Sequence, residues 1–490
     1  MSLKTACEDI VGAENIKDDP ATLKKYSHDQ SFVPASQPDL VVFPNTTREV
    51  QEIVRLANRT ATPLVPLSSG LNFHGAAIPT RGGIVLNLSQ MNKILSIDTD
   101  NWFAVIEPGV TYEQLQNELS THNLRAMIPL GVPPQRTVLS SILERDPALA
   151  AASFEYGNDL MLDTEIILPE GELFRTGLWA SGGRPGSHLG PVRALLYRFW
   201  TAAQGTLGIM TKMALQVEYL PQQQEILFLP FASLNDSLET MKQIQRNEIG
   251  LECFLFNSFN FAALLCEGWS IPESYPTHKT PSSDFEALRN ALPPWILTIA
   301  LPGAPRLPEE KIAYEKEALT NLCSHLGQDL LTTLPPLDNA QTFFAPFLLR
   351  PWDILKKFCF KGSVHPLSFK SPLKRIPEFE TLIHTALTEH NYPHRDMGIY
   401  LLPMERGRAV HCECDLHCDP SNQQELEQVH KLWLTLSEVL ISKGALFDRP
   451  YGAWADMTYA RTGTYTTKLQ ELKKELDPNN IMNPGKLCFS

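Results

Sequence analysis

The sequence predicts a protein of mixed helices and strands that is divided into at least two domains. Short apolar runs typical of buried strands, such as 84–88 and 103–106, alternate with amphipathic helical patterns over the first 220 residues. From about Pro221 the pattern changes, because long amphipathic helices at 234–246 and 309–326 alternate with proline-rich connections. A chain of 490 residues is long enough for two or three domains with separate cores. We therefore expect a domain boundary near Pro221.

Composition and charge exclude several classes of partner. The chain is 43% hydrophobic and 20% charged, and its formal net charge is -13. Nucleic acids and anionic membranes select clusters of Lys and Arg, so we expect neither as a partner. No apolar run is long enough to span a bilayer, and Glu8 and Asp9 precede any apolar stretch of a secretory signal. Nine cysteines without a C-x-x-C pair predict reduced thiols in a cytoplasmic protein.

The first elements in chain order are a strand at 39–44 and the helix that follows it. Thr46 is followed three residues later by Glu49, which is the spacing of a capping box. The apolar stripe of this helix recurs with helical period at Val50, Ile53, Val54 and Ala57.

The loop at 66–77 reads Pro-Leu-Ser-Ser-Gly-Leu-Asn-Phe-His-Gly-Ala-Ala and lies between two short apolar strands. A loop so rich in small residues leaves backbone N–H groups accessible, and such groups form concave anion sites. Gly and Ser also mark ordinary turns, so the motifs further along the chain decide between the two interpretations. We interpret the loop as a pyrophosphate cradle. Its predicted contacts are Pro66, Ser68, Ser69, Gly70, Leu71, Asn72, His74 and Gly75.

The next elements supply a second set of predicted phosphate contacts. Pro108-Gly109 turns the chain after the strand at 103–106, and Thr111 caps another helix. Residues 131–145 begin as a loop and end in a helical pattern. Helix N-termini favour phosphate, which makes Thr137, Val138 and Ser141 candidates. A Pro-Glu-Gly turn at 169–171 joins two further strands, and a glycine-punctuated turn at 204–208 enters a strand that ends near residue 220.

Six motifs in this order resemble the vanillyl-alcohol oxidase and p-cresol methylhydroxylase family of FAD enzymes. They are the glycine-rich loop, Val105–Thr111, Tyr156-Gly157, Gly171–Gly177, Gly205–Lys212 and the terminal Asp477–Lys486. The resemblance covers nearly the whole chain and is strongest over 39–220 and at the C-terminus. It implies an α+β fold, in which a two-subdomain FAD-binding domain of the p-cresol methylhydroxylase type carries an α+β cap domain over the isoalloxazine ring.

The resemblance also implies a domain division and an activity. Residues 1–221 would form the FAD-binding domain, 222–446 the cap or substrate domain, and 447–490 a segment that returns to the FAD-binding domain. The implied activity is that of an FAD-dependent dehydrogenase or oxidase. It would transfer hydride from an activated C–H of an alkylphenol, aryl alcohol or hydroxy acid to flavin N5.

Alternatives and partners follow from the same resemblance. One alternative is a flavin-dependent 2-hydroxyacid dehydrogenase, and another is an enzyme like alkyl-glycerone-phosphate synthase. A third, from another class, is a flavin-binding subunit of an electron-transfer complex. The expected partners are a small organic substrate, a cytochrome or another electron acceptor, and a second copy of the chain in a homodimer.

Site residues carry over from the family only position by position. In relatives that bind phenolate substrates, two tyrosines and an arginine hold the substrate. The aligned positions here are Phe73, Asp448 and Arg449, so only the arginine is present in this sequence. Asn158 takes the position of the aspartate near N5, and we also place Tyr451 in the site. An alternative role for Arg449 is a structural ion pair with Asp448. Further cofactor contacts are Pro129, Gly131, Glu144, Arg145, Tyr156, Gly157, Asp159, Gly205, Gly208, Ile209, Thr211 and Lys486.

The histidines that attach flavin covalently in some relatives are absent at the aligned positions. These positions hold Gly398 and Asn72. We therefore expect dissociable FAD, with His74 and His394 as the residues that would form a bond if the alignment were shifted.

The segment His411–Cys418 alternates strictly, so His411, Glu413, Asp415 and His417 share one face of a predicted strand. Three interpretations remain open. The face lines the flavin site, with His411 and Glu413 as acid–base or substrate-binding groups; it is solvated; or it binds a metal. Same-face neighbours are ~7 Å apart, so three of them reach one ion poorly. We predict no metal.

Overall fold

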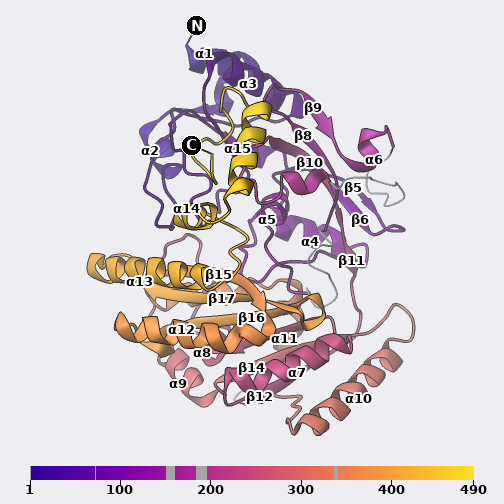
Figure 1. The fold of residues 1–490 in the computed structure, drawn as a ribbon. Helices are drawn as coiled ribbons and strands as arrows, with labels where there is room; N and C mark the ends of the chain where they lie inside the picture. Colours follow the sequence, from indigo (N-terminus) through magenta and orange to yellow (C-terminus); the bar gives the residue numbers. More distant parts are fainter. Residues whose placement is uncertain (1, 72, 151–159, 184–195, 336–339, 490) are drawn as a thin grey trace.

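The computed structural model describes residues 2–71, 73–150, 160–183, 196–335 and 340–489, and it contains four β-sheets (Figure 1). Three sheets lie in the upper part of Figure 1, with the N-terminal 220 residues and the C-terminal segment. The six-stranded sheet lies below them. The mixed α+β fold class is confirmed. Within the described residues, no helix combines the length and apolar character needed to cross a membrane.

The first sheet has the strand order β1-β2-β4-β3, in which β2, β4 and β3 run parallel and β1 is antiparallel. Its elements, with the helices that accompany them, are α1 (Leu3–Val11), β1 (Ile16–Lys17), α2 (Pro20–Lys25), β2 (Leu40–Val42), α3 (Thr47–Thr60), β3 (Leu64–Leu67) and β4 (Ile84–Asn87). The predicted cap by Thr46 is confirmed at the start of α3, but the Glu49 side chain returns to Asn45, one residue before the N-cap. The Thr46 hydroxyl accepts the Glu49 N–H at 3.2 Å, and Glu49 Oε2 accepts the Asn45 N–H at 2.7 Å.

The second sheet is antiparallel, with the order β5-β6-β10-β8-β9. Its elements and neighbours are β5 (Ile94–Asp98), β6 (Phe103–Ile106), α4 (Tyr112–Ser120), α5 (Val138–Leu143), β8 (Met161–Ile167), β9 (Leu173–Arg175), α6 (Gly177–Ala180) and β10 (Ile209–Gln216). The short strands β7 (Leu124–Arg125) and β11 (Glu218–Tyr219) pair beside it. As predicted, the turn after residue 168 joins β8 to β9.

The six-stranded sheet is antiparallel throughout, with the order β12-β14-β13-β16-β17-β15. Its strands are β12 (Gln224–Phe231), β13 (Glu252–Asn257), β14 (Trp295–Pro302), β15 (Ser363–Pro372), β16 (Gly398–Met404) and β17 (Ala409–Cys418). We call it the cap sheet. All of its strands come from the region that begins after Pro221, the predicted boundary.

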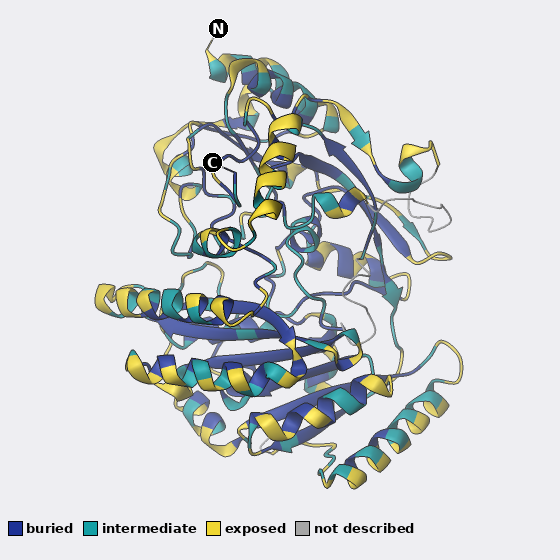
Figure 2. Ribbon diagram, viewed as in Figure 1, coloured by how far each residue is buried: buried dark blue, intermediate teal, exposed yellow. Residues whose placement is uncertain are grey.

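Helices cover the cap sheet on two sides, and each side has its own apolar core. One core includes side chains of α7 (Leu234–Arg246), α10 (Pro308–Leu326), α12 (Ile376–Glu389) and α13 (Gln423–Ser442). The other includes α8 (Ser258–Leu265), α9 (Ser283–Ala291) and α11 (Ala340–Leu349). The strands are buried, whereas the outer faces of the helices are exposed (Figure 2). This amphipathic arrangement is what the helical patterns predicted.

The C-terminal segment continues through α14 (Ala453–Tyr459) and α15 (Thr464–Leu476) and then reaches the first sheet. The Leu64 N–H donates to the carbonyl of Ile481 at 2.7 Å, and the Asn483 N–H donates to the carbonyl of Leu64 at 2.8 Å. Residues 481–483 therefore lie along β3, immediately before the glycine-rich loop.

Candidate cofactor and substrate site

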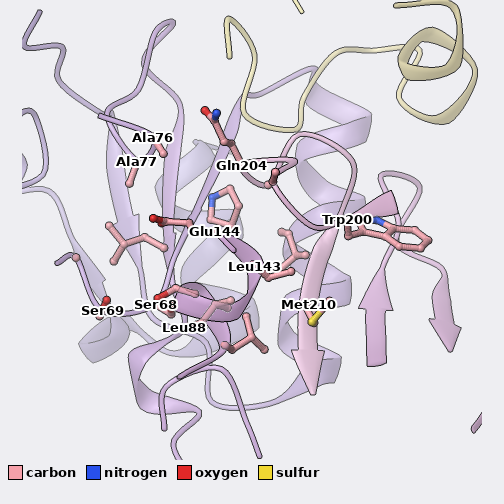
Figure 3. A pocket seen from close by; sticks show the side chains of 18 of the residues that line it. Ser68, Ser69, Ala76, Ala77, Leu88, Leu143, Glu144, Trp200, Gln204 and Met210 are labelled. Carbon is pink, nitrogen blue, oxygen red and sulfur yellow. The ribbon is translucent and has the colours of Figure 1, made fainter. Parts of the chain in front are cut away.

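A cavity at the end of β3 brings together three segments that are far apart in the sequence (Figure 3). We call it the first cavity. It is lined by residues 66–70, 76–77, 88, 136, 139–140, 143–144, 200, 202, 204–205, 208–210 and 451. The glycine-rich loop, α5 and the turn before β10 thus surround one space.

Two glycines shape the first cavity for different reasons. At Gly205 (φ +70°) a Cβ atom would lie 2.3 Å from the Pro66 side chain, so only glycine lets the two loops approach this closely. At Gly70 (φ +67°) a Cβ atom would meet only Leu67 carbons, at 3.9 Å or more. Gly70 therefore leaves space in the cavity itself, as a loop that receives a ligand requires.

Hydroxyl groups connect the glycine-rich loop to α5. Ser68 Oγ lies 2.6 Å from Thr137 Oγ1, which lies 2.8 Å from Ser140 Oγ. Ser68 and Ser140 line the cavity, whereas Thr137 does not line it and contacts both of their hydroxyl groups. Two residues predicted as phosphate contacts have hydrogen-bond partners within the protein. The Val138 N–H already donates to the carbonyl of Val110 at 3.0 Å, and Ser141 Oγ donates to Asp146 Oδ2 at 2.9 Å. The phase of α5 turns Leu139 and Ser140 to the cavity instead.

A second cavity lies between the loops of the upper region and the cap sheet. It is lined by residues 30, 73–74, 129–133, 136, 146–147, 355, 357–358, 364, 366, 368, 400, 411, 413, 415 and 449. It shares Arg136 with the first cavity. A third cavity, lined by residues 31–34, 73–75, 80, 204, 365–366, 430, 433, 451–456 and 485–487, adjoins both.

The alternating face of β17 forms one wall of the second cavity. The solvated interpretation is wrong, because His411, Asp415 and His417 are buried. No group of three potential metal ligands occurs in the part of the chain that the structure describes. His411, Glu413 and Asp415 line the cavity, while His417 packs against Phe259 with ring centroids 4.6 Å apart. The interpretation that remains is a polar wall of the candidate site.

A buried lysine neutralises part of this wall. Lys357 lies on the short 3-10 helix at Asp353–Cys359, and its Nζ donates to Asp415 Oδ2 at 2.7 Å and to Glu413 Oε1 at 3.1 Å. Burial raises the pKa of Asp415 to about 7, although the Lys357 ammonium opposes the shift. No sequence pattern pointed to Lys357, because its partners lie more than fifty residues away.

Arg449 also lines the second cavity, but its partners differ from the predicted one. Its guanidinium donates to Asp146 Oδ1 and, at 3.0 Å, to Ser368 Oγ. The structural pair with Asp448 is wrong, since Asp448 turns away and binds Lys370 Nζ at 2.5 Å. Asp146 additionally accepts from Arg136 at 3.3 Å. Asp146, which the sequence analysis missed, therefore holds two cations, and one of them, Arg449, also reaches Ser368 of the cap sheet.

The remaining predicted residues divide among the three cavities. The first cavity is lined by Pro66, Ser68, Ser69, Gly70, Glu144, Gly205, Gly208 and Ile209. The second is lined by Pro129 and Gly131, and the third by Gly75 and Lys486. His74 lines both the second and the third cavity, and Tyr451 lines both the first and the third. Leu71, Thr137, Arg145 and Thr211 line none of the three; Thr211 donates to Glu165 instead. Asn72, Tyr156, Gly157, Asn158 and Asp159 lie outside the described residues.

Comparison with known proteins identifies two domains in the chain. Two family models match: an FAD binding domain over residues 38–177 and the C-terminal domain of FAD linked oxidases over residues 409–487. The chain therefore carries both domains of FAD linked oxidases, and its resemblance to the p-cresol methylhydroxylase family is confirmed. Its cofactor is FAD.

Individual relatives span nearly the whole chain. The flavoprotein subunit of the hydroxylating 4-cresol dehydrogenase of Pseudomonas putida is 24% identical over 483 residues, which are 92% of this chain and 88% of that protein. Glycolate oxidase subunit GlcD of Bacillus subtilis is 24% identical over 500 residues, 98% and 95% of the two chains. A structure of p-cresol methylhydroxylase with substrate bound has a TM-score of 0.80 at 21% identity, covering 99% and 96%. This last likeness concerns the fold.

The first cavity fits the cofactor of this family of FAD-linked oxidoreductases. The space beside Gly70 and the hydroxyl groups of Ser68, Ser69 and Ser140 suit a pyrophosphate. Beyond it, the Tyr451 ring stacks on His74, with centroids 4.7 Å and planes 12° apart. Lys486 Nζ donates to the carbonyl of Gly75 at 2.8 Å, so the C-terminal motif fixes the end of the glycine-rich loop.

Two of the positions considered for a covalent flavin bond, Gly398 and His394, offer little support for one. At Gly398 a Cβ atom would lie 2.6 Å from Asn260 Oδ1, so the aligned histidine would displace Asn260. His394 lies in the short 3-10 helix at His394–Asp396, where its Nδ1 is 2.6 Å from His384 Nδ1, and it lines none of the three cavities.

We therefore predict that acid denaturation releases the flavin of this oxidoreductase into the supernatant, because neither aligned position holds a nucleophile. The measurement is visible absorbance of the supernatant and flavin fluorescence of the polypeptide on a denaturing gel. Fluorescence that stays with the polypeptide would contradict the prediction, and His74, which lines the second cavity, would be the first residue to replace.

Proposed function

We propose that this chain oxidises a small organic substrate, bound in the second cavity, by transfer of hydride from an activated C–H to flavin N5. The observation that carries the proposal is the second cavity, which adjoins the FAD cavity through Arg136 and is lined by buried ionisable groups of both regions. FAD, when bound, supplies the hydride-accepting chemistry. The residues of the chain then bind and orient the substrate and accept its proton.

Three side chains have separate roles in this proposal. Arg449 binds an anionic group of the substrate, since its planar fork suits a carboxylate or phenolate. Burial, together with Arg449 and Lys370, lowers the pKa of His411 well below its usual value, so the imidazole is neutral and can accept a proton. Glu413, held by Lys357, is the second candidate acid–base group.

The lining of the cavity favours an acidic substrate over a neutral alkylphenol. Phe73 takes the position of one phenol-binding tyrosine and packs against Tyr275 and Phe358, with ring centroids 5.2 and 5.8 Å away. It offers no hydroxyl to a phenol, whereas the lining includes two arginines, Arg449 and Arg136, which share Asp146 as a partner. This supports the 2-hydroxyacid alternative, the class to which the substrate named for glycolate oxidase belongs.

An anaerobic flavin-reduction screen tests the proposal. Purified holoenzyme is mixed with phenols, aryl alcohols and hydroxy acids under argon, and we expect an acid-bearing alcohol to abolish the visible flavin absorbance. Oxygen, a cytochrome or an artificial acceptor is then added to learn which one restores it. If no compound reduces the flavin, the proposed hydride transfer is wrong. The alternatives are then an exchange reaction without net redox and a flavin-binding subunit of an electron-transfer complex.

A further inference from the structure

Several buried polar atoms that line the second cavity have no hydrogen-bond partner among the described residues. On the cap wall they are Tyr400 Oη, His411 Nδ1 and Asp415 Oδ1, and the amide of Gln30 adds both of its atoms. These four residues are at most 7% exposed. Leaving a buried polar atom without a hydrogen bond is unfavourable, so native proteins rarely keep several such atoms together. Such atoms around a cavity indicate a ligand that completes their hydrogen bonds.

The strand register places the three cap-wall groups on one face. Tyr400 lies opposite Glu413 in the β16–β17 ladder, while His411 and Asp415 flank Glu413 two residues away on either side. The rings of Tyr400 and His411 meet edge to face, with centroids 5.9 Å apart. Since same-face neighbours on a strand are ~7 Å apart, the wall is matched by a ligand with several polar groups rather than one.

The charged groups around the cavity pair with one another. On the cap wall Lys357 lies between Glu413 and Asp415, and Arg449 connects Ser368 of β15 to Asp146, which also pairs with Arg136. A carboxylate placed beside Tyr400 would lie next to Glu413, its partner in the strand ladder. An alkyl group there would leave the polar atoms unpaired. A hydroxyl group avoids both costs, because it donates and accepts and carries no charge.

The protonation states fit hydroxyl binding. Burial raises the pKa of Tyr400 well above its usual value, so its hydroxyl remains a donor. His411 is neutral, so one ring nitrogen donates and the other accepts. The Gln30 amide likewise offers one donor group and one acceptor.

From this geometry we propose that the cap wall is a hydroxyl-binding subsite, and that the substrate is a polyhydroxylated acid. Its carboxylate faces Arg449, and its chain carries at least two hydroxyl groups toward Tyr400, His411 and Gln30. This rests on the proposed function for the position of the acid, and it adds the chemistry of the rest of the molecule.

The test compares two six-carbon 2-oxo acids that cannot be oxidised at C2. Binding of 2-oxogluconate and of 2-oxohexanoate to the oxidised holoenzyme is measured by calorimetry. We expect the hydroxylated acid to bind at least about ten-fold more tightly, because sites built to hydrogen-bond a hydroxyl reject analogues that lack it. Tyr400→Phe should reduce this preference several-fold and keep the flavin content of the parent.

Tyr275→Phe is a matched control. Its hydroxyl is also buried without a partner among the described residues, but Tyr275 lines none of the three cavities. It should keep the full preference. Gln30→Leu serves as the second variant should Tyr400→Phe not fold. The preference of the unmutated protein for 2-oxogluconate over 2-oxohexanoate tests the subsite without any variant.

Three outcomes overturn the subsite: equal affinities, tighter binding of 2-oxohexanoate, or no binding of either acid. Loss of flavin from Tyr400→Phe also overturns it, since the unpaired atoms would then belong to the cofactor. The reduction screen separates this failure from failure of the proposed function. If a phenol reduces the flavin and 2-oxogluconate binds no more tightly than 2-oxohexanoate, only the hydroxyl-binding subsite is refuted. If 2-oxogluconate binds more tightly but no compound reduces the flavin, only the proposed hydride transfer is refuted.

Discussion

Gly70→Val is expected to give colourless protein. The backbone at Gly70 has φ +67°, and a Cβ atom there points into the first cavity, where the nearest protein atom is a Leu67 carbon at 3.9 Å. A branched side chain would therefore occupy the space left for the pyrophosphate of FAD and would also strain the backbone by ~1–2 kcal/mol. The ratio of flavin absorbance to protein absorbance after purification measures the effect.

The strain and the blocked cavity are separated by a control at Gly327. This glycine has the same φ, +67°, at the C-terminal end of α10, and a Cβ atom there meets nothing within 4 Å. Gly327→Val should lose a similar amount of stability in a thermal melt while it retains its flavin. A Gly70→Val protein with full flavin content would remove the glycine-rich loop from the cofactor site.

Arg449→Met is expected to slow substrate-driven flavin reduction by roughly thirty-fold or more and to leave the flavin bound. Removing one partner of a desolvated charge pair typically costs ~2–5 kcal/mol, and each ~1.4 kcal/mol is a factor of ten. The flavin stays because Asp146 keeps Arg136 and Ser141 as partners at the border of the first cavity. Stopped-flow absorbance under argon measures the rate.

Two further variants show whether the slower reduction comes from losing the specific contacts of Arg449. Arg449→Lys should recover only part of the rate, because an ammonium supplies the charge without the planar fork that reaches Asp146 and Ser368 together. Arg395→Met removes an exposed arginine that pairs with Glu286 on the cap surface, and it should reduce at the parent rate. If Arg449→Met also reduces as fast as the parent with the same substrate, Arg449 is structural and the anionic substrate is refuted.

Local elements were accessible from the sequence because their signals are local. The cap that Thr46 makes with Glu49 needs only three residues of spacing, and the helix predicted at 234–246 coincides with α7. The alternation of 411–418 correctly placed three polar side chains on one face of β17, since strand periodicity is a property of the backbone. Whether that face of β17 contacts solvent or a cavity depends on the segments that pack against it, and strand periodicity carries no information about those segments.

The composition of the site depended on contacts between distant segments. Arg449 and Asp146 are 303 residues apart, and Lys357 and Asp415 are 58 apart, so no spacing rule connects them. The phase of α5 was likewise set from outside the helix, by the hydrogen bond from Val138 to Val110, which turned Ser140 rather than Ser141 to the cavity.

By itself the sequence determined the α+β class, the succession of helices and strands, and the resemblance to FAD enzymes, because these depend on local patterns and on the order of motifs. Tertiary structure alone decided which charges meet. Buried ionisable groups must be paired wherever the fold brings opposite charges within hydrogen-bond distance, and that distance is set by the packing of the cap sheet against the upper region. The partners Asp146 and Lys357 became visible only there.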